Sequence, residues 1–171
     1  MIRALGFLVF SVLALAAWHR IPPDVPTLPL PPLTEKIDLI EIDKSERRLT
    51  VYRDGVSLRS YDVALGFSPE GHKAKEGDGR TPEGRYWIDR RNPQSAFHLS
   101  LGINYPRPLD QLKAAAHGVS PGGDIFIHGQ PNGSAIVHRG DWTEGCIALT
   151  NQEMEELWRI VEVGTEVVIW P

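Results

Sequence analysis

The residues best suited to chemistry lie in segment 125–151, where a histidine and the one cysteine of the chain stand eighteen residues apart. His128 follows a short apolar run, and Cys146 directly follows Gly145. A thiol becomes a strong nucleophile when it loses its proton, and a nearby imidazole can accept that proton near neutral pH. Because Gly145 has no side chain, a carbonyl group can approach the backbone N–H groups around Cys146, which could bind an oxyanion. The pattern predicts acyl transfer, with Cys146 as nucleophile and His128 as general base, although spacing alone leaves open whether the two meet.

Short strands are expected to position this pair. Runs of apolar residues bounded by turn residues predict strands at 37–42, 49–53, 56–65, 85–89, 97–103, 125–127 and 167–170. The dipeptide Asp54-Gly55 between the second and third of these favours a two-residue hairpin turn. His128 would therefore stand at the end of a buried strand.

Two helices are expected to accompany the strands. Segment 109–116 is predicted to be a short helix that ends at Gly118. Thr150 and Glu153 have the spacing of a capping box, which predicts that a longer helix begins there. Its apolar stripe includes Val161, and its end is expected at Gly164. The fold is thus predicted to be mainly β and sandwich-like, with one short and one longer helix.

The first 35 residues are expected to lie outside the folded domain. Residues 1–17 have a short positive start and an apolar run with an A-x-A cleavage signal, which predicts a signal peptide, with an uncleaved anchor as the alternative. Residues 18–35 contain six prolines between Pro22 and Pro32 and predict an extended linker. The domain at 36–171 would then be exported to the periplasm or cell envelope.

The cysteine count gains meaning from that location. Exported proteins usually pair their cysteines, whereas this chain has one and can form no internal disulfide. A lone exported thiol is either a buried, inert residue or a reactive group, and residue type alone leaves both interpretations open. The net charge of −4 gives no reason to expect nucleic-acid binding, because such proteins usually carry a basic face.

Four short motifs follow one another between residues 37 and 171. They are Gly79-Arg80-Thr81-Pro82-Glu83-Gly84, Leu101-Gly102-Ile103-Asn104-Tyr105-Pro106, Ile127-His128-Gly129, and Gly145-Cys146-Ile147 followed by Asn151. In type and order they resemble the L,D-transpeptidase catalytic domain family, also called the YkuD fold. The spaced His-Gly and Gly-Cys pair is the most specific part of this resemblance.

The resemblance implies a mechanism that uses neither a metal nor an organic cofactor. Cys146 corresponds to the family nucleophile and His128 to its general base, which the carbonyl of Gly129 would orient, while the backbone of Gly145 and Cys146 would bind the oxyanion. The implied substrate is the peptidoglycan stem tetrapeptide. The thiolate attacks the carbonyl at the L-centre of its diamino acid and D-alanine leaves. An amine of another stem or of an envelope protein then takes the acyl group.

Two positions depart from the family pattern. Glu144 stands where the family usually has a second histidine, and Ala148 stands where many members have Arg or Asn. The Glu144 carboxylate should disfavour the thiolate because like charges repel, unless it binds an amine of the substrate or turns away. His138, in the intervening loop, could supply the missing imidazole. Two alternatives therefore stay open, namely a wall amide hydrolase that uses the same thiol and a wall-binding module without catalysis.

Two further positions, Trp142 and Arg80, are candidate binding groups. Trp142 is interpreted either as a core residue or as a wall of the substrate site. Arg80 is usually expected on a solvated face, but near a cleft it could bind a stem carboxylate. Asp124, His128 and His138 show no recognised metal-ligand spacing, so no metal site is expected.

Overall fold

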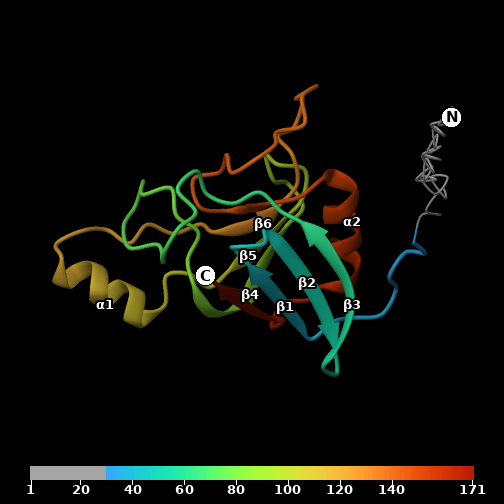
Figure 1. Ribbon diagram of the computed structural model, residues 1–171, viewed down its shortest axis with the longest axis horizontal. Coiled ribbons are helices and arrows are strands. Elements are labelled where there is room, and N and C mark those ends of the chain that lie inside the picture. Colours follow the sequence, from blue (N-terminus) through green and yellow to red (C-terminus); the bar gives the residue numbers. More distant parts are fainter. Residues whose placement is uncertain (1–29) are drawn as a thin grey trace, which may run out of the picture. The chain divides into compact units, whose positions relative to one another are not determined.

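Residues 30–171, which a computed structural model describes, form one curled eight-stranded sheet with two helices (Figure 1). The strand order is β3-β2-β1-β8-β4-β5-β6-β7. The strands are β1 (Leu39–Asp43), β2 (Arg48–Arg53), β3 (Val56–Asp62), β4 (Gly84–Asn92), β5 (Ser100–Ile103), β6 (Phe126–His128), β7 (Ile147–Ala148) and β8 (Glu166–Trp170). The helices are α1 (Pro108–Ala116) and α2 (Asn151–Ile160).

The signal peptide predicted at 1–17 and most of the linker predicted at 18–35 lie outside the described residues. Residues 32–171 make up one compact unit, which begins near the predicted domain boundary at residue 36. Among the described residues, neither helix has the length and apolar character needed to cross a membrane.

Strand β4 belongs to both halves of the sheet. Its first part, Gly84–Trp87, pairs with β8 and its second part, from Ile88, pairs with β5, and a register shift between Ile88 and Arg90 lies within the β5 pairing. Such a bulge bends a strand and increases its twist, which lets the two halves face each other. Beyond the end of β3, Ala64 pairs with Ala148 of β7, so the sheet curls back on itself. The mainly β, sandwich-like fold with two helices is confirmed.

The local signals in the sequence are confirmed where they depend on near neighbours. Asp54 and Gly55 both have positive φ, of 50° and 75°, as the predicted turn between β2 and β3 requires. Thr150 Oγ1 accepts a hydrogen bond from Glu153 N–H at 3.3 Å, and Glu153 Oε2 accepts one from Thr150 N–H at 3.0 Å. The capping box therefore begins α2 as predicted.

Several predicted boundaries are wrong; for example, the strand expected at 56–65 ends at Asp62, and the one expected at 85–89 continues to Asn92. The strand expected from residue 97 begins at Ser100, because His98 adopts φ 66° and interrupts the extended backbone. The second helix ends at Ile160 and not at Gly164, because Val161 takes extended angles. Val161 is fully buried, so its apolar side chain contributes to the core from outside the helix.

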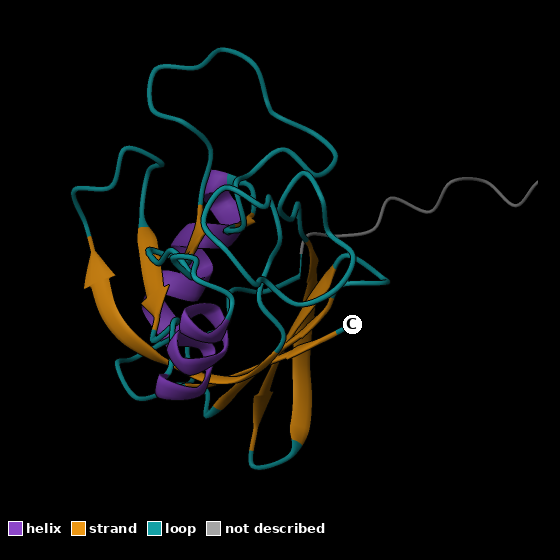
Figure 2. Ribbon diagram, turned by 90° about the vertical axis from the view of Figure 1, so that its left-hand side faces the viewer, coloured by secondary structure: helices purple, strands orange, loops and turns teal. Residues whose placement is uncertain are grey.

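Helix α2 lies against the part of the sheet that leads to the candidate site. It contacts β5 and β6, and it buries Met154, Leu157 and Ile160 completely. Several long loops gather above one end of the strands (Figure 2). The buried helix contact therefore supports β6, whose last residue is His128.

Candidate active site

A cavity of about 690 Å³ contains both predicted catalytic residues. Four segments distant in sequence line it, within the ranges 73–77, 92–100, 122–128 and 142–146. His128 enters from the end of β6, and Cys146 from the residue before β7. The parallel pairing of β6 with β7 places these two chain segments side by side.

His128 is held in the protonation state of a base. It is 4% exposed, and its Nδ1 donates a hydrogen bond to the carbonyl oxygen of Gly129 at 2.7 Å. Nδ1 therefore carries the proton, which leaves the lone pair on Nε2. Burial lowers the pKa of His128, and the Gly129 hydrogen bond only partly opposes this shift. The imidazole is therefore neutral and can accept a proton at neutral pH.

Aromatic rings fix the plane of this imidazole. The Phe97 ring lies with its centroid 4.6 Å from that of His128, and the Trp142 ring packs edge-on at 5.7 Å. Trp142 is partly buried and lines the cavity. Of the two interpretations of Trp142, the structure places it as a wall of the cavity. Phe97 was not predicted as a site residue.

Gly129 has too little room for a side chain. A Cβ atom there would lie 2.6 Å from Oδ1 of Asn151 and 3.0 Å from Cβ of His98. Its N–H donates to the carbonyl of Phe97 at 3.1 Å. The carbonyl that accepts the hydrogen bond of His128 is thus fixed from several sides.

Cys146 rests as a protonated thiol. Burial raises its pKa, Asp124 and Glu144 add to the shift, and the Phe126 N–H and Lys73 oppose it. Sγ accepts from the N–H of Phe126 at 3.4 Å and donates to the carbonyl of Asp124 at 3.5 Å. These are backbone partners at the start of β6, whereas His128 ends that strand. In the described residues the thiol does not hydrogen-bond to the imidazole of His128.

A threonine shapes the loop that carries Cys146. The Thr143 hydroxyl donates to the carbonyl of Cys146 at 2.7 Å and accepts from the N–H of Gly145 at 3.1 Å. Of the two expected oxyanion donors, Gly145 N–H is therefore already engaged. The N–H of Cys146 has no acceptor in the part of the chain that the structure describes. Thr143 was not singled out from the sequence, although a threonine three residues before the cysteine fits the Ser/Thr of the family motif.

Three glycine backbones meet next to Cys146. Gly145 has φ 133°, and a Cβ atom there would lie 2.6 Å from the carbonyl oxygen of Arg80. A Cβ atom on Gly66 would clash with the carbonyl of Gly79 and lie 3.0 Å from Cα of Gly145. The close approach holds the 66–80 segment against the nucleophile loop.

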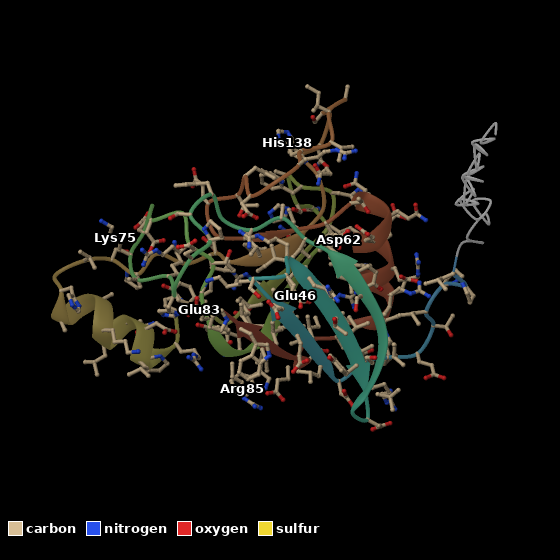
Figure 3. All side chains as sticks on the ribbon, in the orientation of Figure 1. Glu46, Asp62, Lys75, Glu83, Arg85 and His138 are labelled. Atoms are coloured by element: carbon tan, nitrogen blue, oxygen red, sulfur yellow. The ribbon has the colours of Figure 1, made fainter. Side chains whose placement is uncertain are left out.

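The remaining predicted residues have separate positions. Glu144 is exposed, lines the cavity and has no ion-pair partner among residues 30–171. The Arg80 side chain does not line this cavity and lies at an adjoining one. His138, labelled in Figure 3, lies on an exposed loop and is not among the residues that line the cavity. Its ring stacks on that of Trp142, with the ring centroids 4.8 Å apart. The structure therefore does not bring the His138 imidazole into the place of the missing second histidine.

Sequence reasoning missed a buried lysine in the same cavity. Lys73 is 3% exposed, and its Nζ donates to Oδ1 of Asp78 at 2.9 Å and to the carbonyl of Lys75 at 3.3 Å. Burial alone would raise the pKa of Asp78, but hydrogen bonds from Lys73 and from three backbone N–H groups lower it to about 2. The charge of Lys73 lowers the pKa of the nearby thiol. Nothing in its polar, glycine-rich sequence surroundings indicates this burial.

Comparison with known proteins identifies relatives in sequence and in fold. The family model of the L,D-transpeptidase catalytic domain (YkuD) matches residues 37–169. YafK of Escherichia coli (strain K12) is 30% identical over 128 residues, which are 71% of this chain and 46% of YafK. The helical cell shape determining protein Pgp2 of Campylobacter jejuni is 28% identical with a TM-score of 0.62, over 79% of this chain and 48% of Pgp2.

A more distant solved structure shares the fold. An L,D-transpeptidase of Xylanimonas cellulosilytica is 18% identical with a TM-score of 0.52, over 81% of this chain and 63% of that one. The chain spans about half the length of the curated relatives that it matches. The family model covers most of the chain and includes His128, Gly145 and Cys146. The chain therefore belongs to the L,D-transpeptidase catalytic domain family.

Proposed function

We propose that the protein is a cell-envelope L,D-transpeptidase that forms an acyl-enzyme on Cys146 with a peptidoglycan stem tetrapeptide. The observation that carries the proposal is the position of Cys146 and His128 on one cavity, with Nε2 of His128 free of its proton. The family acts on peptidoglycan stem peptides, which supports the substrate class. Export through the segment at 1–17, as a cleaved signal peptide or a membrane anchor, is part of the same proposal.

The first half of the reaction forms the acyl-enzyme. The Cys146 thiol turns towards His128 and gives its proton to Nε2, and Sγ attacks the carbonyl at the L-centre of the diamino acid. The oxyanion that forms accepts a hydrogen bond from the free N–H of Cys146. The protonated His128 then gives its proton to the amine of D-alanine, which leaves as the thioester forms.

The second half transfers the acyl group. An amine of another stem or of an envelope protein attacks the thioester carbonyl, and His128 takes the proton that this amine loses. Collapse of the tetrahedral intermediate breaks the bond to Sγ, and His128 gives its proton to the departing sulfur, which restores the thiol and the neutral imidazole. The walls formed by Phe97 and Trp142 keep water away from the imidazole during these steps.

A cell-wall amide hydrolase, acting as an L,D-carboxypeptidase or on crosslinks, is the second candidate. It is favoured by one observation: the unpaired carboxylate of Glu144 lines the cavity and could direct a water molecule at the thioester. A wall-binding module without catalysis is the third, and the presence of both Cys146 and His128 in one cavity argues against it.

Incubation with purified muropeptides separates these functions. A transpeptidase yields products with the mass of crosslinked stems and released D-alanine, and a hydrolase yields trimmed or separated stems. The Cys146→Ala variant is the control and should yield neither. Wild-type protein that binds muropeptides but leaves their masses unchanged would contradict both enzymatic proposals.

A further inference from the structure

A second cavity, of about 840 Å³, adjoins the Cys146 cavity. It lies between the 68–80 segment and α1, and Lys73 and Gly77 line both cavities. The labelled Lys75 shows where this segment lies relative to α1 in Figure 3. Because the two cavities share lining residues, one extended ligand can occupy both.

The two cavities carry opposite charge. The second cavity is lined by four basic side chains and two carboxylates, a formal charge of +2 in a chain whose net charge is −4. Its basic residues are Lys73, Lys75, Arg80 and Lys113. The Cys146 cavity is lined by one basic side chain and three carboxylates, a formal charge of −2, counting His128 as neutral.

The two carboxylates of the second cavity are committed to other partners. Asp78 accepts hydrogen bonds from Lys73 Nζ and from the backbone N–H groups of residues 74, 75 and 80. Asp110 is 5% exposed, and its carboxylate lies 3.3 Å from Nε2 of His72. It also accepts a hydrogen bond from the backbone N–H of Arg107 at 2.9 Å. These acids therefore do not neutralise the remaining cations.

Three cations are left without a partner of opposite charge. The side chains of Lys75, Arg80 and Lys113 form neither an ion pair nor a hydrogen bond in the described part of the chain. Arg80 is partly buried and lines the second cavity. A guanidinium offers two parallel N–H groups that match a carboxylate, and a lysine adds a second positive charge.

The backbone that carries these cations is well anchored. Ser68 N–H donates to the carbonyl of Gly79 at 2.9 Å, and Glu76 N–H donates to that of Ser120 at 2.8 Å. The buried Lys44 donates to the carbonyl of Thr81 at 3.1 Å, directly after Arg80. The backbone that carries Lys75 and Arg80 is thus held by hydrogen bonds on both sides of these residues.

We propose that, when the reacting carbonyl of the stem peptide lies at Cys146, the second cavity binds a carboxylate of that peptide other than the one of D-alanine. The inference rests on the proposed function and extends it, because it assigns a second subsite to the same substrate. The negative Cys146 cavity receives an ammonium group of the peptide near Glu76 and Glu144, whose carboxylates form no ion pair within residues 30–171. The positive cavity receives its carboxylate through Arg80 and Lys113. A diamino acid in the stem supplies both charges within one residue.

The test compares two forms of the stem tetrapeptide, one with all its carboxylates free and one with every carboxylate except that of D-alanine converted to an amide. Binding is measured by calorimetry to the Cys146→Ala variant with and without Arg80→Gln and Lys113→Gln. We expect the double substitution to weaken binding of the free acid about tenfold or more, as loss of a charge-assisted contact does. Binding of the amidated peptide should not change.

A matched control removes charge elsewhere. In wild-type protein the exposed side chain of Arg48, on β2, pairs with Glu46. Arg48→Gln removes this cation and should leave the affinities for both peptides unchanged. Equal weakening for both peptides, or no weakening for the free acid, would overturn the inference. Failure of the proposed function is seen separately, as wild-type protein that turns over neither peptide, because the binding measurement does not depend on turnover.

Discussion

The carbonyl oxygen of Gly129 lies 2.7 Å from Nδ1 of His128 and accepts its hydrogen bond. The partner is the backbone of the next residue, so no third side chain is needed to orient the base. The interaction fixes the tautomer that leaves Nε2 ready to accept a proton. Together with the raised pKa of the thiol, it indicates a resting neutral pair and not a thiolate–imidazolium pair.

His128→Ala should lower kcat/KM by about 10²- to 10⁴-fold, the usual contribution of a general base. In wild-type protein, kcat/KM should fall as the pH drops and the imidazole becomes protonated. Because burial lowers the pKa of His128 below its ordinary value of 6.5, that fall should have its midpoint below pH 6.5. The variant should lose this acidic limb and gain activity as the thiol ionises at high pH. An unchanged pH–rate profile in the variant would count against His128 as the base.

Cys146→Ala should abolish turnover while the fold stays intact, and Cys146→Ser should leave very little activity. Residual activity above about a tenth of wild type would be incompatible with a covalent nucleophile. Because burial raises the pKa of Cys146 above its ordinary value of 9.0, alkylation of free protein should be slow at pH 7 and accelerate in the alkaline range.

Membership of the family further predicts acylation by carbapenem β-lactams, seen as an added intact mass.

Thr143→Ala should lower kcat and also destabilise the fold, because it removes a buried hydroxyl that makes two hydrogen bonds in the nucleophile loop. The free energy of unfolding should fall by about 1–3 kcal/mol, the cost of leaving buried polar groups unpaired. Thr143→Ser keeps the hydroxyl and should restore most of both quantities. Chemical denaturation and steady-state kinetics measure them. A serine variant as impaired as the alanine variant would assign the effect to the lost methyl group.

Glu144→His should shift products from hydrolysis towards crosslinks and speed thiol alkylation near neutral pH. The Glu144 carboxylate lines the cavity and contributes to the raised pKa of Cys146, although burial is the main cause. Glu144→Gln removes the charge without supplying an imidazole, so it separates the two effects. The ratio of hydrolysed to transferred stem peptide is the readout. If neither variant changes this ratio, the carboxylate plays no part in partitioning.

The features that sequence could predict depend on neighbours close in the chain. The Asp54-Gly55 turn and the Thr150 capping box are of this kind, because a few backbone angles and side-chain reaches decide them. The position of His128 at a strand end follows from an apolar run and the residue after it. Each of these features is determined by residues close to one another in the chain, and the three-dimensional fold is compatible with it.

The features that sequence could not predict depend on distant segments. Lys73 lies in a polar stretch, and its burial follows from the cage of hydrogen bonds around Asp78. The side chain of Arg80 lines the adjoining cavity, while its backbone carbonyl lies against Gly145. The residue type of Arg80 does not predict that its side chain and its backbone face different parts of the molecule. The closure of the sheet through Ala64 and Ala148 joins residues far apart in the chain.

The meeting of Gly66, Gly79 and Gly145 limits how this enzyme can change over evolutionary time. Any single replacement at Gly66 or Gly145 puts a carbon atom where another main chain already lies. A change tolerated at Gly66 would need a compensating shift at Gly79, and one at Gly145 would need a shift at Arg80, 65 residues earlier in the chain. Side chains on the cavity walls carry no such restriction, so substrate preference can diverge by substitution around a nucleophile whose backbone stays where it is.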